Sequence, residues 1–182
     1  MFFKMKWIMS ALFLKFFCKK LGMPSYFSYP IFFKGLNKVS IGKNVRIFPG
    51  ARIEVHNNGS IEIGDNVGIG QNFHITSAGR LIIGENTTIT ANVCISNIIH
   101  PYEDINQLIS AQPIKVKDTI IGESCFIGFG TVILPGTKLG KYCIVGANSI
   151  VNSHFPDYSV IAGNPARLIK QYNFATNTWD RV

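Results

Sequence analysis

The sequence has few charged residues and lacks the paired cysteines that bind metals. Only 15% of its 182 residues are charged, whereas 47% are hydrophobic. Such a composition excludes a disordered chain and predicts one folded unit with a sizeable core. No CxxC pair occurs among the four cysteines, Cys18, Cys94, Cys125 and Cys143. We expect them to be small hydrophobic residues in a reducing compartment, rather than metal ligands or catalytic thiols.

Acidic residues are also scarce, which leaves a formal net charge of +8. That charge suits an anionic partner, such as a phosphorylated cofactor, a nucleotide-linked sugar, a membrane surface or a nucleic acid. A nucleic acid is not expected, because no basic helix or zinc-ligand spacing accompanies the charge.

Residues 1–21 lack an uninterrupted apolar run of the ~20 residues that a membrane span needs, because lysines interrupt them. They also lack the small-residue cleavage site of a signal peptide. On a helix, Lys4, Lys15 and Lys19 lie on one side, opposite a broad apolar face of Phe2, Met5, Met9, Leu12, Phe13 and Phe16. Two interpretations stay open: the helix lies on an anionic membrane surface, or this face packs against the domain or another subunit.

Aliphatic residues recur every six positions from Val39 onward. Fifteen such positions are aliphatic without exception: Ile41, Ile47, Ile53, Ile63, Ile69, Ile75, Ile83, Ile89, Ile95, Ile121, Ile127, Ile133, Leu139, Val145 and Val151. A period of six with recurrent glycine excludes an amphipathic helix. It predicts short strands joined by tight turns, with three hexads closing one triangular coil and stacked coils sharing one core.

The same spacing predicts where the chain leaves the coil. The interval between in-phase residues lengthens from six to ten after Ile53, to eight after Ile75 and to twenty-six after Ile95. All three insertions leave from one corner, and the third adds a loop over residues 101–119, long enough to be functional. We therefore expect an all-β protein with a parallel β-helix of about five triangular coils over residues 39–160. A partly helical extension (1–38) precedes it and a short tail (161–182) follows.

The hexads resemble the hexapeptide-repeat acyltransferases over residues 39–170. The segment IGENTTITANVCISNIIHP (83–101) is similar to the galactoside and maltose acetyltransferases and ends in the same His-Pro pair. VILPGTKLGKYCIVGANSIV (132–151) and VIAGNPARLIK (160–170) resemble the family's last coil and tail. This resemblance implies a left-handed β-helix, a homotrimer with active sites between subunits, and acetyl-CoA as acyl donor with no required metal.

The loop HPYEDINQLISAQPI (100–114) is most similar to O-acetyltransferases acting on surface-polysaccharide sugars. Those enzymes often carry Asp-His-Asn-His where this chain has Asn97, Ile98, Ile99 and His100, so their first histidine is missing here. The implied function is acetyl transfer to a sugar hydroxyl in capsule or lipopolysaccharide synthesis. The implied location is the cytoplasm, either free or peripheral on the inner membrane face through residues 1–21.

His100 is the expected catalytic base, because an imidazole can take the proton of an attacking hydroxyl near pH 7. Glu103, Asp104 or a backbone carbonyl could hold its other ring nitrogen. A backbone N–H at a coil corner is expected to stabilise the oxyanion.

Donor and acceptor sites follow from the same resemblance. The pantetheine arm of the donor could follow a groove along Gly128, Gly146 and Ala147. Gly163, Arg167 and Lys170 could approach its phosphates, unless the two basic residues only form a solvated tail. Asn72 and His74 are candidates for the acceptor pocket, although asparagine is also common at corners for backbone reasons.

Three other functions are compatible with a β-helix. A serine acetyltransferase has the same repeat, but the helical domain that precedes it there is absent. A non-catalytic β-helix, as in ice-binding proteins, would show regular outward threonine arrays and no long loop. A γ-class carbonic anhydrase needs three zinc-binding histidines, whereas the histidines here occupy different phases of the hexad: His56, His74, His100 and His154.

Overall fold

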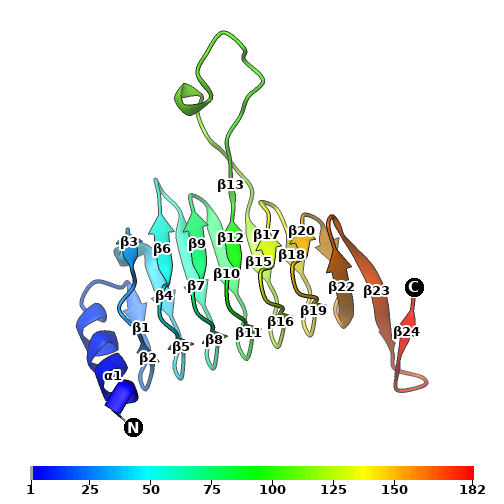
Figure 1. Cartoon of the computed structure of the whole chain (residues 1–182), viewed down its shortest axis with the longest axis horizontal. Coiled ribbons are helices and arrows are strands. Elements are labelled where there is room, and N and C mark those ends of the chain that lie inside the picture. Colours follow the sequence, from blue (N-terminus) through cyan, green and yellow to red (C-terminus); the bar gives the residue numbers. More distant parts are fainter. Residues whose placement is uncertain (1) are drawn as a thin grey trace.

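A computed structural model, which describes residues 2–182, shows a parallel β-helix with three sheets along its sides (Figure 1). The first sheet contains β1 (Lys20–Leu21), β4 (Val39–Ile41), β7 (Ser60–Ile63), β10 (Arg80–Ile83), β15 (Thr119–Ile121), β18 (Lys138–Leu139) and β21 (His154–Phe155). The second contains β2 (Tyr26–Phe27), β5 (Arg46–Ile47), β8 (Gly68–Ile69), β11 (Thr88–Ile89), β16 (Phe126–Ile127), β19 (Ile144–Val145) and β22 (Ser159–Gly163). The third contains β3 (Phe32–Lys34), β6 (Arg52–Val55), β9 (His74–Ser77), β12 (Cys94–Ser96), β17 (Val132–Ile133) and β20 (Ile150–Val151).

The repeated aliphatic residues form the core, which confirms the hexad interpretation. None of the fifteen is more than 4% exposed. In the register of the ladders each stands directly on its counterpart in the next coil, as Ile75, Ile95 and Ile133 do. The stacked coils thus bury these apolar side chains, which a single hexad could not bury alone.

The number of coils differs from the expected five. The third sheet has six strands and the first has seven, so the chain forms six complete coils and part of a seventh. The first coil lies within residues 1–38, where Leu21, Phe27 and Phe33 take the in-phase positions. Phe155 does so in the last coil. A pattern restricted to aliphatic residues misses these aromatic ones.

Further elements adjoin both ends of the β-helix (Figure 1). Helix α1 (Phe2–Leu14) lies at the first coil, followed by a 3₁₀ turn η1 (Leu36–Lys38) before the second coil. The expected tail is an ordered antiparallel extension of the second sheet, β23 (Ala166–Asn173) and β24 (Thr178–Arg181). Within residues 2–182, no helix has the length and apolar character needed to cross a membrane.

At some corners of the coil a glycine has no room for a side chain. Two glycine-to-alanine variants test this. A Cβ at Gly64 would stand 2.5 Å from the Glu85 backbone nitrogen, whereas one at Gly68 would meet only the Arg46 guanidinium, at 3.4 Å. Gly64→Ala should lower the free energy of unfolding by about 1–3 kcal/mol through overpacking. Gly68→Ala should change it by less than about 0.5 kcal/mol. Urea denaturation of both variants checks this, and equal losses would contradict the tight stacking of corners.

Candidate active site

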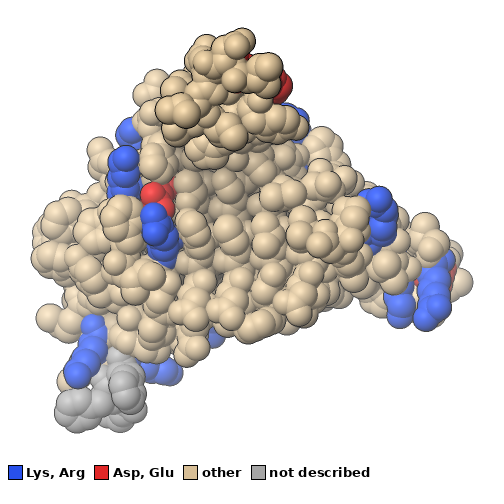
Figure 2. Space-filling view, turned by 45° about the horizontal axis from the view of Figure 1, so that its top comes forward, with Lys and Arg blue, Asp and Glu red and all other residues tan. Residues whose placement is uncertain are grey.

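The long loop leaves the β-helix as a two-stranded antiparallel ribbon, β13 (Ile98–Ile99) paired with β14 (Lys115–Val116), which stands out from the coil in Figures 1 and 2. Buried Asn97 anchors its base. The Asn97 side chain accepts a hydrogen bond from the Ala78 N–H at 2.9 Å and donates one to the Ser77 hydroxyl at 3.0 Å. The predicted loop is therefore held in one direction, with a short 3₁₀ turn η2 (Ile109–Ala111) near its tip.

A pocket of about 270 Å³ lies where this ribbon meets the third sheet. It is lined by His56, His74, Thr76, Cys94, Ser96, Ile98, His100 and Ile114. His100 is exposed, and His74 reaches the pocket from β9 with its Nε2 atom 2.9 Å from the Thr76 hydroxyl. The structure thus brings together the predicted base and one predicted acceptor residue.

A buried carboxylate adjoins the same pocket. Glu54 is 8% exposed, and its Oε1 atom accepts a hydrogen bond from the Arg52 guanidinium. The Nε2 atom of His56 lies 3.3 Å from its other oxygen, and that of His74 lies 3.6 Å from Oε1. Arg52, followed by His56, lowers the pKa of the Glu54 carboxyl, so this group is an anion at neutral pH. Sequence reasoning missed Glu54 because no motif marks it. Arg52 and His56 are its neighbours along the chain, but its approach to His74 depends on the stacking of the next coil.

The Glu54 carboxylate should stabilise the fold in a pH-dependent way. Because its pKa is lowered in the folded protein, its contribution is present above the ordinary glutamate pKa and is lost as pH falls through the lowered value. Wild type should therefore melt at a higher temperature than Glu54→Gln at neutral pH, and the difference should shrink below about pH 4. Melting curves at both pH values test this, and a gap that widens in acid would show the opposite linkage.

The two carboxylates near His100 in sequence have other partners. Glu103 accepts a hydrogen bond from Lys115 at 2.7 Å, which is the main cause of its lowered pKa. Asp104 accepts hydrogen bonds from Gln107 and from the Asn106 N–H. Among the described residues, neither carboxylate hydrogen-bonds to His100. An orienting role for Glu103 or Asp104 stays a prediction, and it would require the loop to rearrange.

The second predicted acceptor residue lies elsewhere. Asn72 occupies a corner with a positive φ of 55°, and its side-chain amide donates a hydrogen bond to the side-chain oxygen of Asn92 at 3.0 Å. It is not among the residues that line the His100 pocket. Backbone geometry alone accounts for asparagine here.

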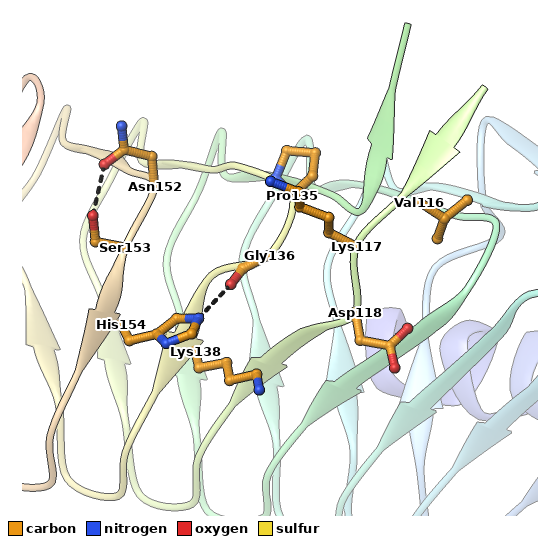
Figure 3. Close-up of a pocket in the computed structure, with 9 residues that line it drawn as sticks. All are labelled: Val116, Lys117, Asp118, Pro135, Gly136, Lys138, Asn152, Ser153 and His154. Atoms are coloured by element: carbon orange, nitrogen blue, oxygen red, sulfur yellow. Dashed lines mark hydrogen bonds between the residues drawn. The ribbon is translucent and has the colours of Figure 1, made fainter. Parts of the chain in front are cut away.

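A larger pocket of about 840 Å³ lies on the other side of the ribbon (Figure 3). It is lined by Val116, Lys117, Asp118, Pro135, Gly136, Lys138, Asn152, Ser153 and His154. Figure 3 shows the His154 ring turned toward the Gly136 carbonyl, 3.0 Å from it, with Lys138 beside it. Lys117 and Lys138 outnumber the single carboxylate of the lining, Asp118, so the site carries a net positive charge that suits anionic groups. Sequence reasoning missed it, although aligning the coils would have paired Lys138 with His154.

The residues predicted to bind the donor lie along the later coils and the C-terminal extension. A Cβ at Gly128 would come 2.6 Å from the Ala147 nitrogen, and one at Gly146 would come 3.0 Å from the Ala162 Cβ, so stacking alone requires small residues here. Gly163, Arg167 and Lys170 lie in the β22–β23 hairpin. Gly163 has a φ of +106°. Arg167 is exposed, and Lys170 is half-buried opposite Val160. The donor role of these six residues stays a prediction.

Three histidines lie closer together than their hexad phases suggested. His56, His74 and His100 line one pocket, because His56 follows the end of a strand and His100 lies in the loop, where phase counting does not apply. Even so, no three His, Cys, Asp or Glu side chains in the described part of the chain are grouped as metal ligands. The four cysteines are free, and Cys125 and Cys143 are buried in the core.

Comparisons with known proteins identify the repeat. Residues 118–153 match the family model "Bacterial transferase hexapeptide (six repeats)". The chain is 31% identical over 161 residues to WbbJ of Escherichia coli K12, named as a lipopolysaccharide biosynthesis O-acetyl transferase, covering 85% of this chain and 82% of that one. It is 34% identical over 116 residues to the galactoside O-acetyltransferase of the same organism, covering 60% and 56%.

Solved structures show the same fold. A point mutant of AntD from Bacillus cereus, an N-acyltransferase solved with dTDP-4-amino-4,6-dideoxyglucose and coenzyme A, superposes with a TM-score of 0.76 at 20% identity, covering 91% of this chain and 90% of that one. A galactoside acetyltransferase in complex with coenzyme A superposes with a TM-score of 0.60 at 23% identity, covering 88% and 68%. Together with the hexad core, the sequence relatives show that the chain belongs to the hexapeptide-repeat acyltransferase family.

Proposed function

We propose that the protein transfers an acetyl group from acetyl-CoA to a hydroxyl of a sugar used in surface-polysaccharide synthesis. The observation that carries the proposal is the pocket at the base of the loop, where exposed His100 faces hydroxyl- and imidazole-bearing side chains. Relatives support the substrate class: WbbJ is named for lipopolysaccharide biosynthesis and WcaF of Escherichia coli for colanic acid biosynthesis, at 31% and 30% identity.

The chemistry assigns one role to His100. Its imidazole takes the proton of the sugar hydroxyl as the oxygen attacks the thioester carbon of the donor. The tetrahedral intermediate collapses when the carbon–sulfur bond breaks, and the imidazolium returns the proton to the leaving thiolate. An alcohol needs such a base more than an amine does, because a neutral amine is already nucleophilic. The presence of His100 therefore favours O-acetylation over N-acylation.

The two pockets beside the ribbon can each bind a different substrate or part of a substrate. His74, Thr76 and Ser96 offer hydrogen bonds to sugar hydroxyls, while Ile98 and Ile114 offer apolar surface to a ring. On the opposite side, the ammonium groups of Lys117 and Lys138 suit phosphates, which both acetyl-CoA and a nucleotide-linked sugar carry.

The loop tip supports a homotrimer. Ile105 is 92% exposed, Leu108 76% and Tyr102 72%, which places a projecting apolar surface in solvent when the chain is alone. Such a surface is expected to be covered in the working protein. We propose that it contacts a neighbouring copy, and that the enzyme works in the cytoplasm.

Thioester consumption tests the reaction. Purified protein is mixed with acetyl-CoA and a panel of nucleotide sugars and oligosaccharides, and release of the free thiol is followed. A sugar-dependent rate is expected. Release that depends on serine and on none of the sugars would establish the serine acetyltransferase alternative instead.

A further inference from the structure

Helix α1 packs one of its sides against the end of the β-helix. Ala11 and Leu14 are fully buried against the first coil, and the Trp7 ring packs against Tyr26 at 6.1 Å and Phe48 at 5.4 Å between centroids. The side of the helix that carries Trp7, Ala11 and Leu14 therefore packs against the domain. The face that the sequence showed to be apolar is turned away from the domain.

That outer face is exposed. Met5 is 61% exposed, Met9 63%, Leu12 41%, Phe13 51% and Phe16 87%. The side chain of Phe2, predicted for the same face, lies outside the described residues. At 100° per residue the four of these side chains that lie within α1 span less than half the helix circumference, opposite the buried side, and Phe16 follows in the turn after Leu14.

The exposed surface continues from the helix onto the first coil. The Phe13 ring lies 5.2 Å from that of Phe17 and 6.4 Å from that of Tyr29. Tyr29 is 51% exposed, and nearby in the same coil Ile31 is 73% exposed. This apolar end surface, made of residues 5, 9, 12, 13, 16, 17, 29 and 31, is too large to be a scatter of single exposed residues.

Positive charge surrounds the same end. In helical projection Lys6 flanks the apolar arc on one side. Lys4 lies nearer the buried side, with its ammonium 5.9 Å from the centre of the Tyr26 ring, and Lys15 follows the helix in an exposed turn. Residues 1–53 contain no acidic residue and ten of the 18 basic ones: Lys4, Lys6, Lys15, Lys19, Lys20, Lys34, Lys38, Lys43, Arg46 and Arg52. The rest of the chain has eight basic and ten acidic residues, so the excess positive charge resides wholly at this end.

We infer that this end docks on an anionic membrane surface, with α1 lying in the interface and its lysines meeting lipid phosphates. The exposed apolar side chains of this end can be buried in the lipid interface, and the lysines around them can approach anionic lipid phosphates. A second copy is a poorer occupant, because two such ends would bring like charges together. The inference does not depend on the acceptor, since membrane binding can be measured without acyl transfer.

Co-sedimentation with vesicles tests the docking. The full-length protein should bind vesicles of equal parts phosphatidylglycerol and phosphatidylcholine, and not vesicles of phosphatidylcholine alone. Binding should weaken as salt is raised. Phe16→Ser should weaken it by at least about tenfold through lost apolar burial. Lys15→Gln combined with Lys19→Gln should weaken it by roughly 30-fold, since each lysine contributes about fivefold.

Matched controls lie at the opposite end of the molecule. Phe174→Ser removes an aromatic ring that is 64% exposed, and Lys141→Gln combined with Arg181→Gln removes two exposed charges. These variants should bind like wild type. Equal binding to both vesicle types, or equal losses in the control variants, would overturn the inference. So would a lower sedimentation mass for Phe16→Ser without vesicles, because that result would make the face a subunit contact.

Discussion

Replacing His100 with alanine is expected to lower kcat/KM for acetyl transfer by at least about 100-fold while leaving the protein folded. The imidazole is exposed at the base of the loop and is not part of the buried core, so its loss removes a base and little packing. Thiol release with the accepted sugar measures the rate, and a melting curve of the same sample measures folding.

Asn106→Ala serves as the matched control for His100→Ala. Its side chain is exposed on the same loop, and only its backbone N–H is hydrogen-bonded, to Asp104. This variant should keep a rate close to that of wild type. A near-wild-type rate for His100→Ala would remove the histidine from the mechanism, and the proposal of a sugar acceptor would then need another base.

Ile95→Ala is expected to lower the free energy of unfolding by about 2–5 kcal/mol. Ile95 is fully buried in β12 and stacks between Ile75 and Ile133 of the neighbouring coils, so truncation opens a cavity in the continuous core. Urea denaturation followed by circular dichroism gives the value.

The loop offers a control of the same residue type. Ile105 is 92% exposed, and Ile105→Ala should change the free energy of unfolding by less than about 0.5 kcal/mol. If the two substitutions cost the same, the in-phase isoleucines would not form the stacked core.

The fold could be predicted from the sequence because one physical requirement recurs along the chain. Each coil must place an apolar side chain inward every six residues, and this pattern located the core, the corner of departure and the long loop. It failed at the two ends, where Phe27, Phe33 and Phe155 occupy in-phase positions. The left hand of the helix and the trimer came from the family resemblance, since a spacing of six does not determine either.

Only part of the candidate site could be predicted from the sequence. The position of His100 followed from the loop, and His74 followed from the resemblance. Glu54 did not, because its approach to His74 joins two coils and its contact with His56 depends on side-chain directions. The partners of Glu103 and Asp104 depend on the conformation of an irregular loop, which no periodic pattern encodes.

The chemical linkage of the acetyl group in the product tests acyl transfer to a hydroxyl most directly. The sugar that supports thiol release is isolated after reaction with acetyl-CoA, treated with mild alkali, and weighed by mass spectrometry before and after. An ester that alkali removes, and that does not form with His100→Ala, is the expected result. An alkali-stable amide would contradict O-acetylation and make the protein an N-acyltransferase.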